Sequence, residues 1–236
     1  MNELILIASL LVIYGMVLLA FKLFGKDGLY SMSVIASVLA NIEVVILITA
    51  FGLDQTLGNI LFAATFLITD ILSECFGKKE ANKAVYMGLF VQIFFLLLSQ
   101  SWLLYKPAAG DGSMDSIKTI FSNTPRMILA SFSVYAVSQM FDVWLYHKWW
   151  SFTEKKFGDK KRFLWLRNNG STLVSQLINA FLFTIVAFAG TYDWGTLMSI
   201  FGSSYVIFIF TSLLDTPIVY LARRIHQTQV NKENIE

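Results

Sequence analysis

The sequence has little of what soluble enzymes use for chemistry. It contains one cysteine and two histidines, so it can form neither an intrachain disulfide nor a Cys/His metal cluster. The motifs of zinc metalloproteases, of serine α/β-hydrolases and of P-loop ATPases are all absent. We therefore expect no catalytic residue, no metal site and no cofactor, and no ATP hydrolysis by this chain itself.

Charge, proline and glycine are also scarce. Only 14% of the 236 residues are charged, against about 25% in soluble domains. The 3 prolines and 14 glycines argue against a disordered, collagen-like or low-complexity chain. What the sequence has instead is apolar surface, since 56% of its residues are hydrophobic. This composition predicts a polytopic membrane protein.

Long apolar stretches support an all-α membrane fold. At roughly 20 residues per crossing, seven stretches could span a bilayer: 3–24, 30–51, 56–76, 84–105, 127–150, 169–190 and 196–222. They are too long for barrel strands and lack alternation, which excludes a closed β-barrel. The first stretch lacks the basic start of a signal peptide and is expected to be retained. We predict one integral-membrane domain over residues 1–236, a bundle of about six to seven transmembrane helices.

Basic residues predict the orientation of this bundle. Fifteen of the 18 lysine and arginine residues fall on one side when the connections are assigned alternately to the two sides. The positive-inside rule then places the N-terminus outside and the C-terminus in the cytoplasm, in the cell (plasma) membrane. Topology thus explains the basic residues, and nucleic-acid binding is not suggested. Segment 113–124 is weakly amphipathic and is either an interfacial helix or lid, or a surface loop.

Carboxylates within the apolar stretches are the most informative polar groups. There are five: Glu43, Asp70, Glu74, Asp142 and Asp215. A charged residue at the bilayer centre costs at least about 2.5 kcal/mol. No lysine or arginine lies deep in a predicted span to pair with them, so each acid is expected to be protonated, hydrated or facing hydrogen-bond donors.

Asp70 and Glu74 lie one helical turn apart on one face of the third stretch, where two ionised carboxylates would repel. One of them is therefore expected to hold a proton, which makes the pair a candidate for proton coupling. Asp70 and Phe66 on the same face are candidates for substrate binding. The alternative for Glu74 is that it reaches water or pairs with Lys78.

The fifth and sixth stretches carry similar patterns, Ser138-Gln139…Asp142 and Ser175-Gln176…Asn179. Because the two helices run in opposite directions, these side chains could face each other around one cavity. The alternative is that they form hydrogen bonds between helices, as polar side chains commonly do in membranes. The substrate-binding candidates here are Tyr135, Gln139, Asp142, Gln176 and Asn179.

The second and seventh stretches are more ambiguous. Asn41 shares a stripe with small hydroxyl residues and is a further substrate-binding candidate. Glu43 lies on the other face beside Ala36 and Ala40, where small residues permit close helix packing and a homodimer. Asp215 precedes a proline that frees a backbone carbonyl, so local hydration explains this acid as well as a functional role does.

The motifs together resemble a known family. The run from Phe62 to Gly77 reads FAATFLITDILSECFG and is similar to the T-D-I-x-x-E-x-[FY]-G signature of the queuosine precursor transporter family, also called the putative vitamin uptake transporter family. Further matches are Ala40-Asn41-Ile42, Ser138-Gln139…Asp142 and Trp165-Leu166-Arg167-Asn168-Asn169…Ser175-Gln176. The resemblance covers roughly residues 30–222. Asn179 departs from it, since the family pattern has an acid there.

The resemblance implies uptake of 7-deazaguanine precursors of queuosine: the cyano base, the aminomethyl base or queuine. A carboxylate can accept two neighbouring N–H groups of a guanine-like edge, amides can meet its carbonyl, and aromatic rings can stack on the base. Proton coupling remains open. One alternative is a substrate-binding subunit of an ATP-driven vitamin uptake complex, and another is an intramembrane enzyme.

Overall fold

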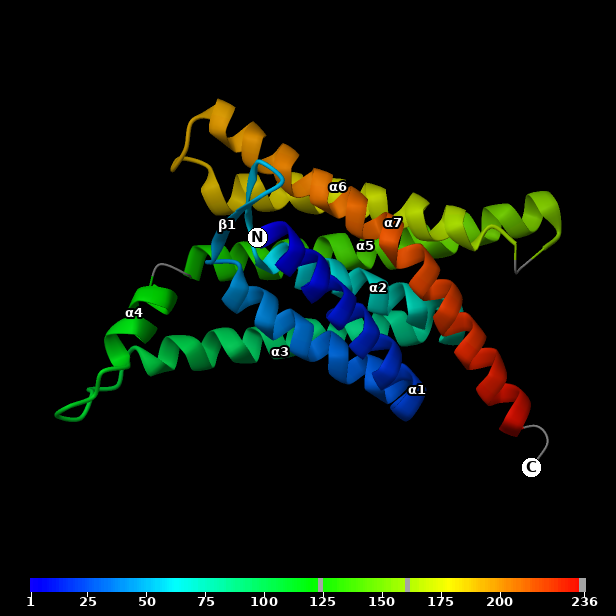
Figure 1. Ribbon diagram of the computed structural model, residues 1–236, viewed down its shortest axis with the longest axis horizontal. Helices are drawn as coiled ribbons and strands as arrows, with labels where there is room; N and C mark the ends of the chain where they lie inside the picture. Colours follow the sequence, from blue (N-terminus) through cyan, green and yellow to red (C-terminus); the bar gives the residue numbers. More distant parts are fainter. Residues whose placement is uncertain (123–124, 160–161, 234–236) are drawn as a thin grey trace.

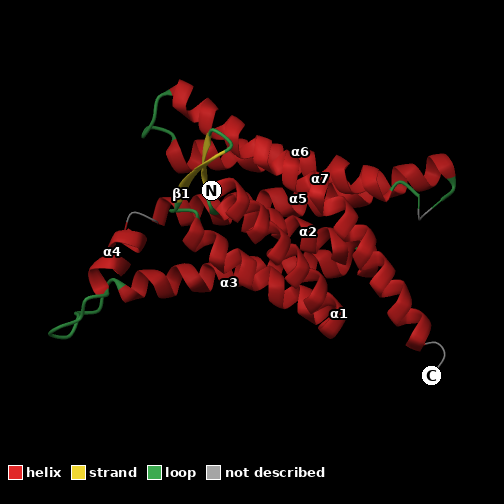
Figure 2. Ribbon diagram, in the orientation of Figure 1, coloured by secondary structure: helices red, strands yellow, loops and turns green. Residues whose placement is uncertain are grey.

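The structure, a computed structural model, describes residues 1–122, 125–159 and 162–233. The elements in chain order are α1 (Asn2–Glu43), β1 (Leu47–Ala50), β2 (Leu53–Thr56), α2 (Gly58–Phe76), α3 (Lys78–Trp102), α4 (Met114–Ser122), α5 (Pro125–Phe157), α6 (Leu164–Phe188) and α7 (Trp194–Glu233). Figure 2 shows how fully helices dominate this part of the chain. Lys160 and Lys161, two of the residues behind the orientation prediction, lie outside the described residues.

Among the residues that the structure describes, five helices are long and apolar enough to cross a membrane: α1, α2, α3, α6 and α7. The predicted all-α, multi-pass membrane fold is therefore confirmed. Helix α5, predicted as a span over 127–150, is not among these five helices. It nevertheless packs against α6, α3 and α2 along its length (Figure 1).

Helix α1 is a folded-back pair rather than one rod. Gly25 adopts φ 58° and ψ −138°, which divides α1 into two helices, and Figure 1 shows the second running back beside the first. Such a backbone conformation is open essentially to glycine alone. The two helices pack closely near the bend, where a Cβ at Gly28 would collide with the carbonyl of Ala20. The prediction of separate first and second helices is confirmed.

The segment after α1 differs from the prediction of a second helix reaching residue 51. Helix α1 ends at Glu43, and β1 and β2 form an antiparallel hairpin in which Ala50 pairs with Leu53. Phe51 and Gly52 both have positive φ, 55° and 73°. This is the two-residue turn that matches strand twist. A short apolar run does not by itself distinguish strand from helix, which explains the wrong assignment.

Helix α2 occupies the centre of the bundle. Every residue from Ala63 to Ser73 is buried, and α1, α3, α5 and α7 pack around the helix. A helix that is apolar on nearly all faces is expected at such a position. The carboxylate of Asp70 is therefore enclosed by protein rather than by lipid.

The segment predicted as either an interfacial helix or a loop forms helix α4. Phe121 packs against Phe95 and Trp102 of α3, with ring centroids 6.1 Å and 5.5 Å away. Gln100 Nε2 donates to the carbonyl of Phe121 at 3.3 Å. Residues 123 and 124 of the predicted segment lie outside the described residues.

Candidate functional site

Two buried aspartates meet between the central helix and its neighbours. Asp70 of α2 and Asp142 of α5 are both 0% exposed, and their carboxyl groups lie within interaction distance of each other. Thr172 Oγ1 of α6 donates to Asp70 Oδ2 at 2.9 Å. Within the described residues, Asp70 Oδ1 and both oxygens of Asp142 have no hydrogen-bond partner. Buried acceptors without donors are costly, so this pair is suited to binding a donor-rich ligand or a proton.

Asp215 of α7 is the third buried aspartate of the bundle, also 0% exposed. Its side chain lies near the hydroxyl of Tyr14 and within electrostatic reach of Asp142. In the described part of the chain neither of its oxygens has a hydrogen-bond partner. Pro217 interrupts the hydrogen bonding of α7 just beyond it.

Gln139, predicted to bind substrate, is held by the central helix. Its Nε2 donates to Thr65 Oγ1 at 2.6 Å, and its Oε1 accepts from Thr69 Oγ1 at 3.1 Å. With both ends of the amide engaged, Gln139 fixes α5 against α2 at the level of the carboxylates. Its contacts suit positioning more than direct recognition.

Gln176 of α6 is in the opposite situation. It is 0% exposed, yet neither Nε2 nor Oε1 has a hydrogen-bond partner among the described residues. It lies one turn beyond Thr172, the residue that donates to Asp70. An amide that is unpaired at both ends, one turn from the residue that bonds Asp70, offers donors and an acceptor to a ligand.

The remaining candidates are divided between two places. Asn41 Nδ2 donates to the carbonyl of Ser37 at 2.8 Å, and its Oδ1 is unpaired within the described chain. The Tyr135 hydroxyl of α5 also lies toward Ser37 of α1. Phe66 is fully buried against Phe62, with ring centroids 5.6 Å apart.

Asn179 lines a small cavity at the hairpin end of the bundle, together with Phe62 and Phe183. The cavity measures about 30 Å³, which is room for a water or two. This cavity, as the described residues form it, is too small for a nucleobase, so binding there requires a rearrangement.

Glu74 corrects the expectation that no basic residue pairs with the buried acids. Arg167 of α6 binds it twice, from Nε to Oε2 at 2.9 Å and from Nη2 to Oε1 at 2.7 Å. Arg223 of α7 approaches Oε1 at 3.5 Å, and the Tyr146 hydroxyl of α5 donates to Oε2 at 2.7 Å. The suggested partner Lys78 is therefore replaced by two arginines. These contacts do not support the predicted proton-carrying role of Glu74.

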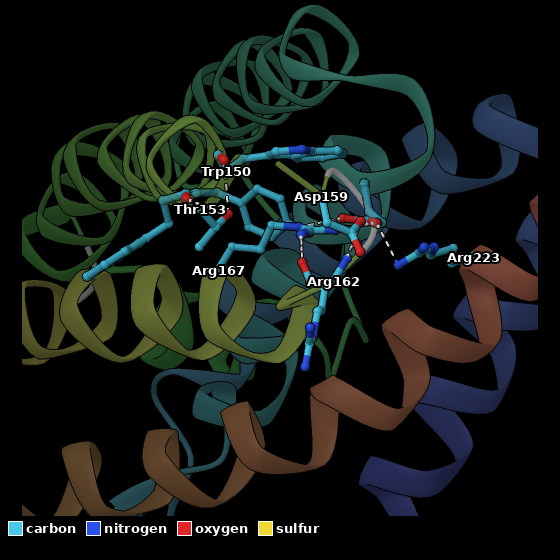
Figure 3. A network of polar contacts seen from close by, with 9 residues as sticks. Trp150, Thr153, Asp159, Arg162, Arg167 and Arg223 are labelled. Carbon is cyan, nitrogen blue, oxygen red and sulfur yellow. Dashed lines mark hydrogen bonds and ion pairs between the residues drawn. The ribbon is translucent and has the colours of Figure 1, made fainter. Parts of the chain in front are cut away.

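Arg167 was missed as a partner because the sixth helix was expected to begin at residue 169. Helix α6 begins at Leu164 instead, which carries Arg167 into the bundle, where it is 0% exposed. Its guanidinium carbon lies 4.2 Å from the centre of the Trp150 ring. Figure 3 shows Trp150, Arg167 and Arg223 converging from α5, α6 and α7. The signal was present, since Arg167 stands within the matched Trp165–Asn169 motif.

Small residues near Glu43 do not form a free surface. Ala36 and Ala40 are buried against Leu61 of α2. The face on which the homodimer expectation rested therefore packs within the chain. Glu43 Oε2 is buried without a hydrogen-bond partner in the described residues.

Comparison with known proteins agrees with the motifs. Residues 56–222 match the family described as "Putative vitamin uptake transporter". A protein of Bacillus subtilis (strain 168) named "Probable queuosine precursor transporter" is 40% identical over 208 residues, covering 88% of this chain and 89% of that protein. The chain belongs to this family. No solved structure matches the chain.

The family match covers most of the site but not all of it. The residues 56–222 include the Asp70–Asp142 pair, the Glu74–Arg167 pair and Asp215. They begin at the last residue of β2, so α1 and most of the hairpin lie outside the match. The Bacillus subtilis relative extends further, since 208 aligned residues out of 236 must include residue 30 and Asn41. The resemblance predicted from about residue 30 is therefore confirmed by this relative.

Proposed function

We propose that this protein is a plasma-membrane uptake carrier for 7-deazaguanine precursors of queuosine. The name of the Bacillus subtilis relative supports this class of substrate. The observation that carries the proposal is the Asp70–Asp142 pair: two fully buried carboxyl groups on neighbouring helices with three oxygens lacking a partner in the described structure. The proposed orientation places the N-terminus outside and the C-terminus in the cytoplasm.

The chemistry of the substrate fits this pair. A guanine-like edge presents adjacent N–H donors, which one carboxylate accepts in parallel. The unpaired amide of Gln176 supplies a donor for the ring carbonyl and an acceptor for a remaining N–H. The hydroxyl of Thr172 already orients Asp70. Arg167 and Glu74 satisfy each other and leave this recognition to the aspartates.

The coupling proton belongs in this proposal to the aspartate pair rather than to Glu74. Two carboxyl groups in contact in a water-poor site cannot both remain ionised, so the pair binds a proton or a donor. Substrate and proton therefore meet at the same oxygens. We propose that the carrier needs no catalytic residue, cofactor or metal, and that the whole chain acts as one unit.

The test is the queuosine content of tRNA in bacteria that lack both precursor synthesis and their own transporter. Cells expressing this chain receive nanomolar cyano base, aminomethyl base or queuine. Wild type should restore queuosine, whereas Asp70→Asn and Asp142→Asn should fail at matched membrane expression. Asp115→Asn, at an exposed position on α4, is the matched control. A correctly inserted wild-type chain that restores nothing with any precursor would refute the proposal.

Purified protein in proteoliposomes separates the alternatives. Uptake without any added subunit excludes dependence on an ATP-driven complex, and intact recovered substrate excludes an intramembrane enzyme. The molecular mass of the purified protein decides whether it forms a homodimer. The proposal does not require one.

A further inference from the structure

The small cavity at the hairpin end is chemically different from the aspartate pair. Helices α2, α5, α6 and α7 contribute its characteristic side chains: Asn59, Phe62, Ser131, Asn179, Phe183 and Phe208. Among the described residues, its lining contains amides, hydroxyls and aromatic rings, and no acidic or basic residue. It is therefore a neutral surface, whereas the deeper site is acidic.

Asn59 is the polar residue whose geometry points most clearly to a ligand. Thr56 Oγ1 donates to its Oδ1 at 3.3 Å, while its Nδ2 is buried without an acceptor in the described structure. The backbone is fixed here, because a Cβ at the preceding Gly58 would lie 2.7 Å from the carbonyl oxygen of Ala40. The orphan donor is thus held in place beside the cavity, and a ligand carbonyl would satisfy it.

Aromatic rings from three helices line the same cavity as Asn59. The rings of Phe62 and Phe208 lie 6.4 Å apart at 45°, and Phe183 of α6 lines the same cavity. Rings in such an arrangement favour a flat apolar body. Asn179, 5% exposed, adds a second amide to the lining. Together they suit a planar heterocycle that carries a lactam edge.

The cavity also lies on a line toward the carboxylates. Helix α2 runs from Phe62 to Asp70, and α6 runs from Asn179 to Thr172. At 1.5 Å per residue each path is about 10–12 Å long.

We propose that this cavity is an entry subsite, which binds the planar base through Asn59, Asn179 and the phenylalanines before the base reaches the aspartates. The inference rests on the proposed function and adds to it a second, neutral binding place. At about 30 Å³ the subsite is too small for the base in this structure, and Thr56 of the hairpin forms part of its wall. Opening it requires movement of the hairpin end of the bundle.

The experiment is equilibrium binding of radiolabelled 7-aminomethyl-7-deazaguanine to the full chain in nanodiscs. In the double variant Asp70→Asn/Asp142→Asn, binding should persist at the entry subsite, weakened by roughly 10- to 100-fold. Adding Asn59→Leu should weaken it about tenfold further. Asn82→Leu, the same change at a surface position of α3, should have no effect.

Phe183→Leu is the second variant, because it removes a ring without touching the orphan amide. It should also weaken residual binding several-fold, and thermal unfolding of each variant checks that the chain is folded. The entry subsite is refuted if wild type binds the base but the double aspartate variant does not. It is also refuted if the double aspartate variant binds the base equally well with and without Asn59→Leu. In both cases the proposed function stands. If wild type neither binds nor transports any deazaguanine, the proposed function has failed first and the subsite fails with it.

Discussion

Arg167 and Glu74 form a two-bond ion pair in the interior of the bundle. The bonds measure 2.9 Å and 2.7 Å, and the side chains are 0% and 3% exposed. Because Tyr146 and Arg223 contact the same carboxylate, Glu74 joins α2 to α5, α6 and α7. A single acidic side chain thus holds four helices together at one end.

Removing Arg167 should strongly destabilise the protein. Arg167→Leu leaves a buried carboxylate with a weaker partner, and breaking one side of such a pair typically costs about 3–5 kcal/mol. Thermal unfolding in a fixed detergent measures the loss. The double variant Glu74→Leu/Arg167→Leu should lose less than the two single variants combined, because it leaves no unpaired charge. Strictly additive losses would show that the pair does not act as a unit.

Removing the charge of Glu74 while keeping the size of its side chain should make the thiol of Cys75 more accessible. Cys75, the single cysteine of the chain, is partly buried next to Glu74. In Glu74→Gln, maleimide labelling of Cys75 should be roughly tenfold faster, as when local opening becomes about 1.4 kcal/mol easier. Glu80→Gln is the control, since Glu80 contacts Tyr30 and Lys26 elsewhere. Equal labelling of Glu74→Gln and wild type would mean that the pair does not close this end.

A proton gradient should drive accumulation if the aspartate pair carries the proton. Lowering the pH outside proteoliposomes relative to the inside favours protonation on the entry side and release within. With one proton per substrate, each pH unit should increase accumulation up to about tenfold. Asp70→Asn should abolish this response, whereas Asp115→Asn should keep it. The same accumulation with and without a gradient in wild type would rule out proton coupling.

Gly25 should be irreplaceable for backbone reasons alone. A Cβ there would meet no atom within 4 Å, yet φ is +58° and ψ is −138°. Gly25→Ala should therefore cost about 1–3 kcal/mol of stability through strain at the bend. Gly15→Ala is the matched control, because Gly15 also has open space but has no positive φ. Indistinguishable unfolding temperatures for the two variants would show that the bend tolerates a side chain.

Local patterns predicted much of the architecture correctly. Apolar runs of membrane-spanning length identified the helices, because burial in lipid demands a continuous apolar surface and internal hydrogen bonding. The motif around Asp70 indicated the family from residues adjacent in the chain. The predictions were wrong at the end of the second helix, where a short apolar run fits a strand as well as a helix. That helix stops at Glu43, and a hairpin follows.

The partners of the buried acids could not be read from the sequence. Asp70 and Glu74 are neighbours on one helix, so the sequence paired them with each other. In the folded chain Asp70 meets Asp142, 72 positions away along the chain, and Glu74 meets Arg167, 93 positions away. The early start of α6 decided the second pairing, because it brings a residue expected in a loop into the bundle.

The sequence by itself therefore determined the membrane setting, the helical class, the family and the set of intramembrane acids. These properties follow from composition, from runs of neighbouring residues and from short motifs. Only the tertiary structure decided which acids carry a cationic partner and which do not, and hence where a ligand or a proton has free oxygens to bind. That division depends on how helices far apart in the chain pack around α2, and local patterns carry no information on such distances.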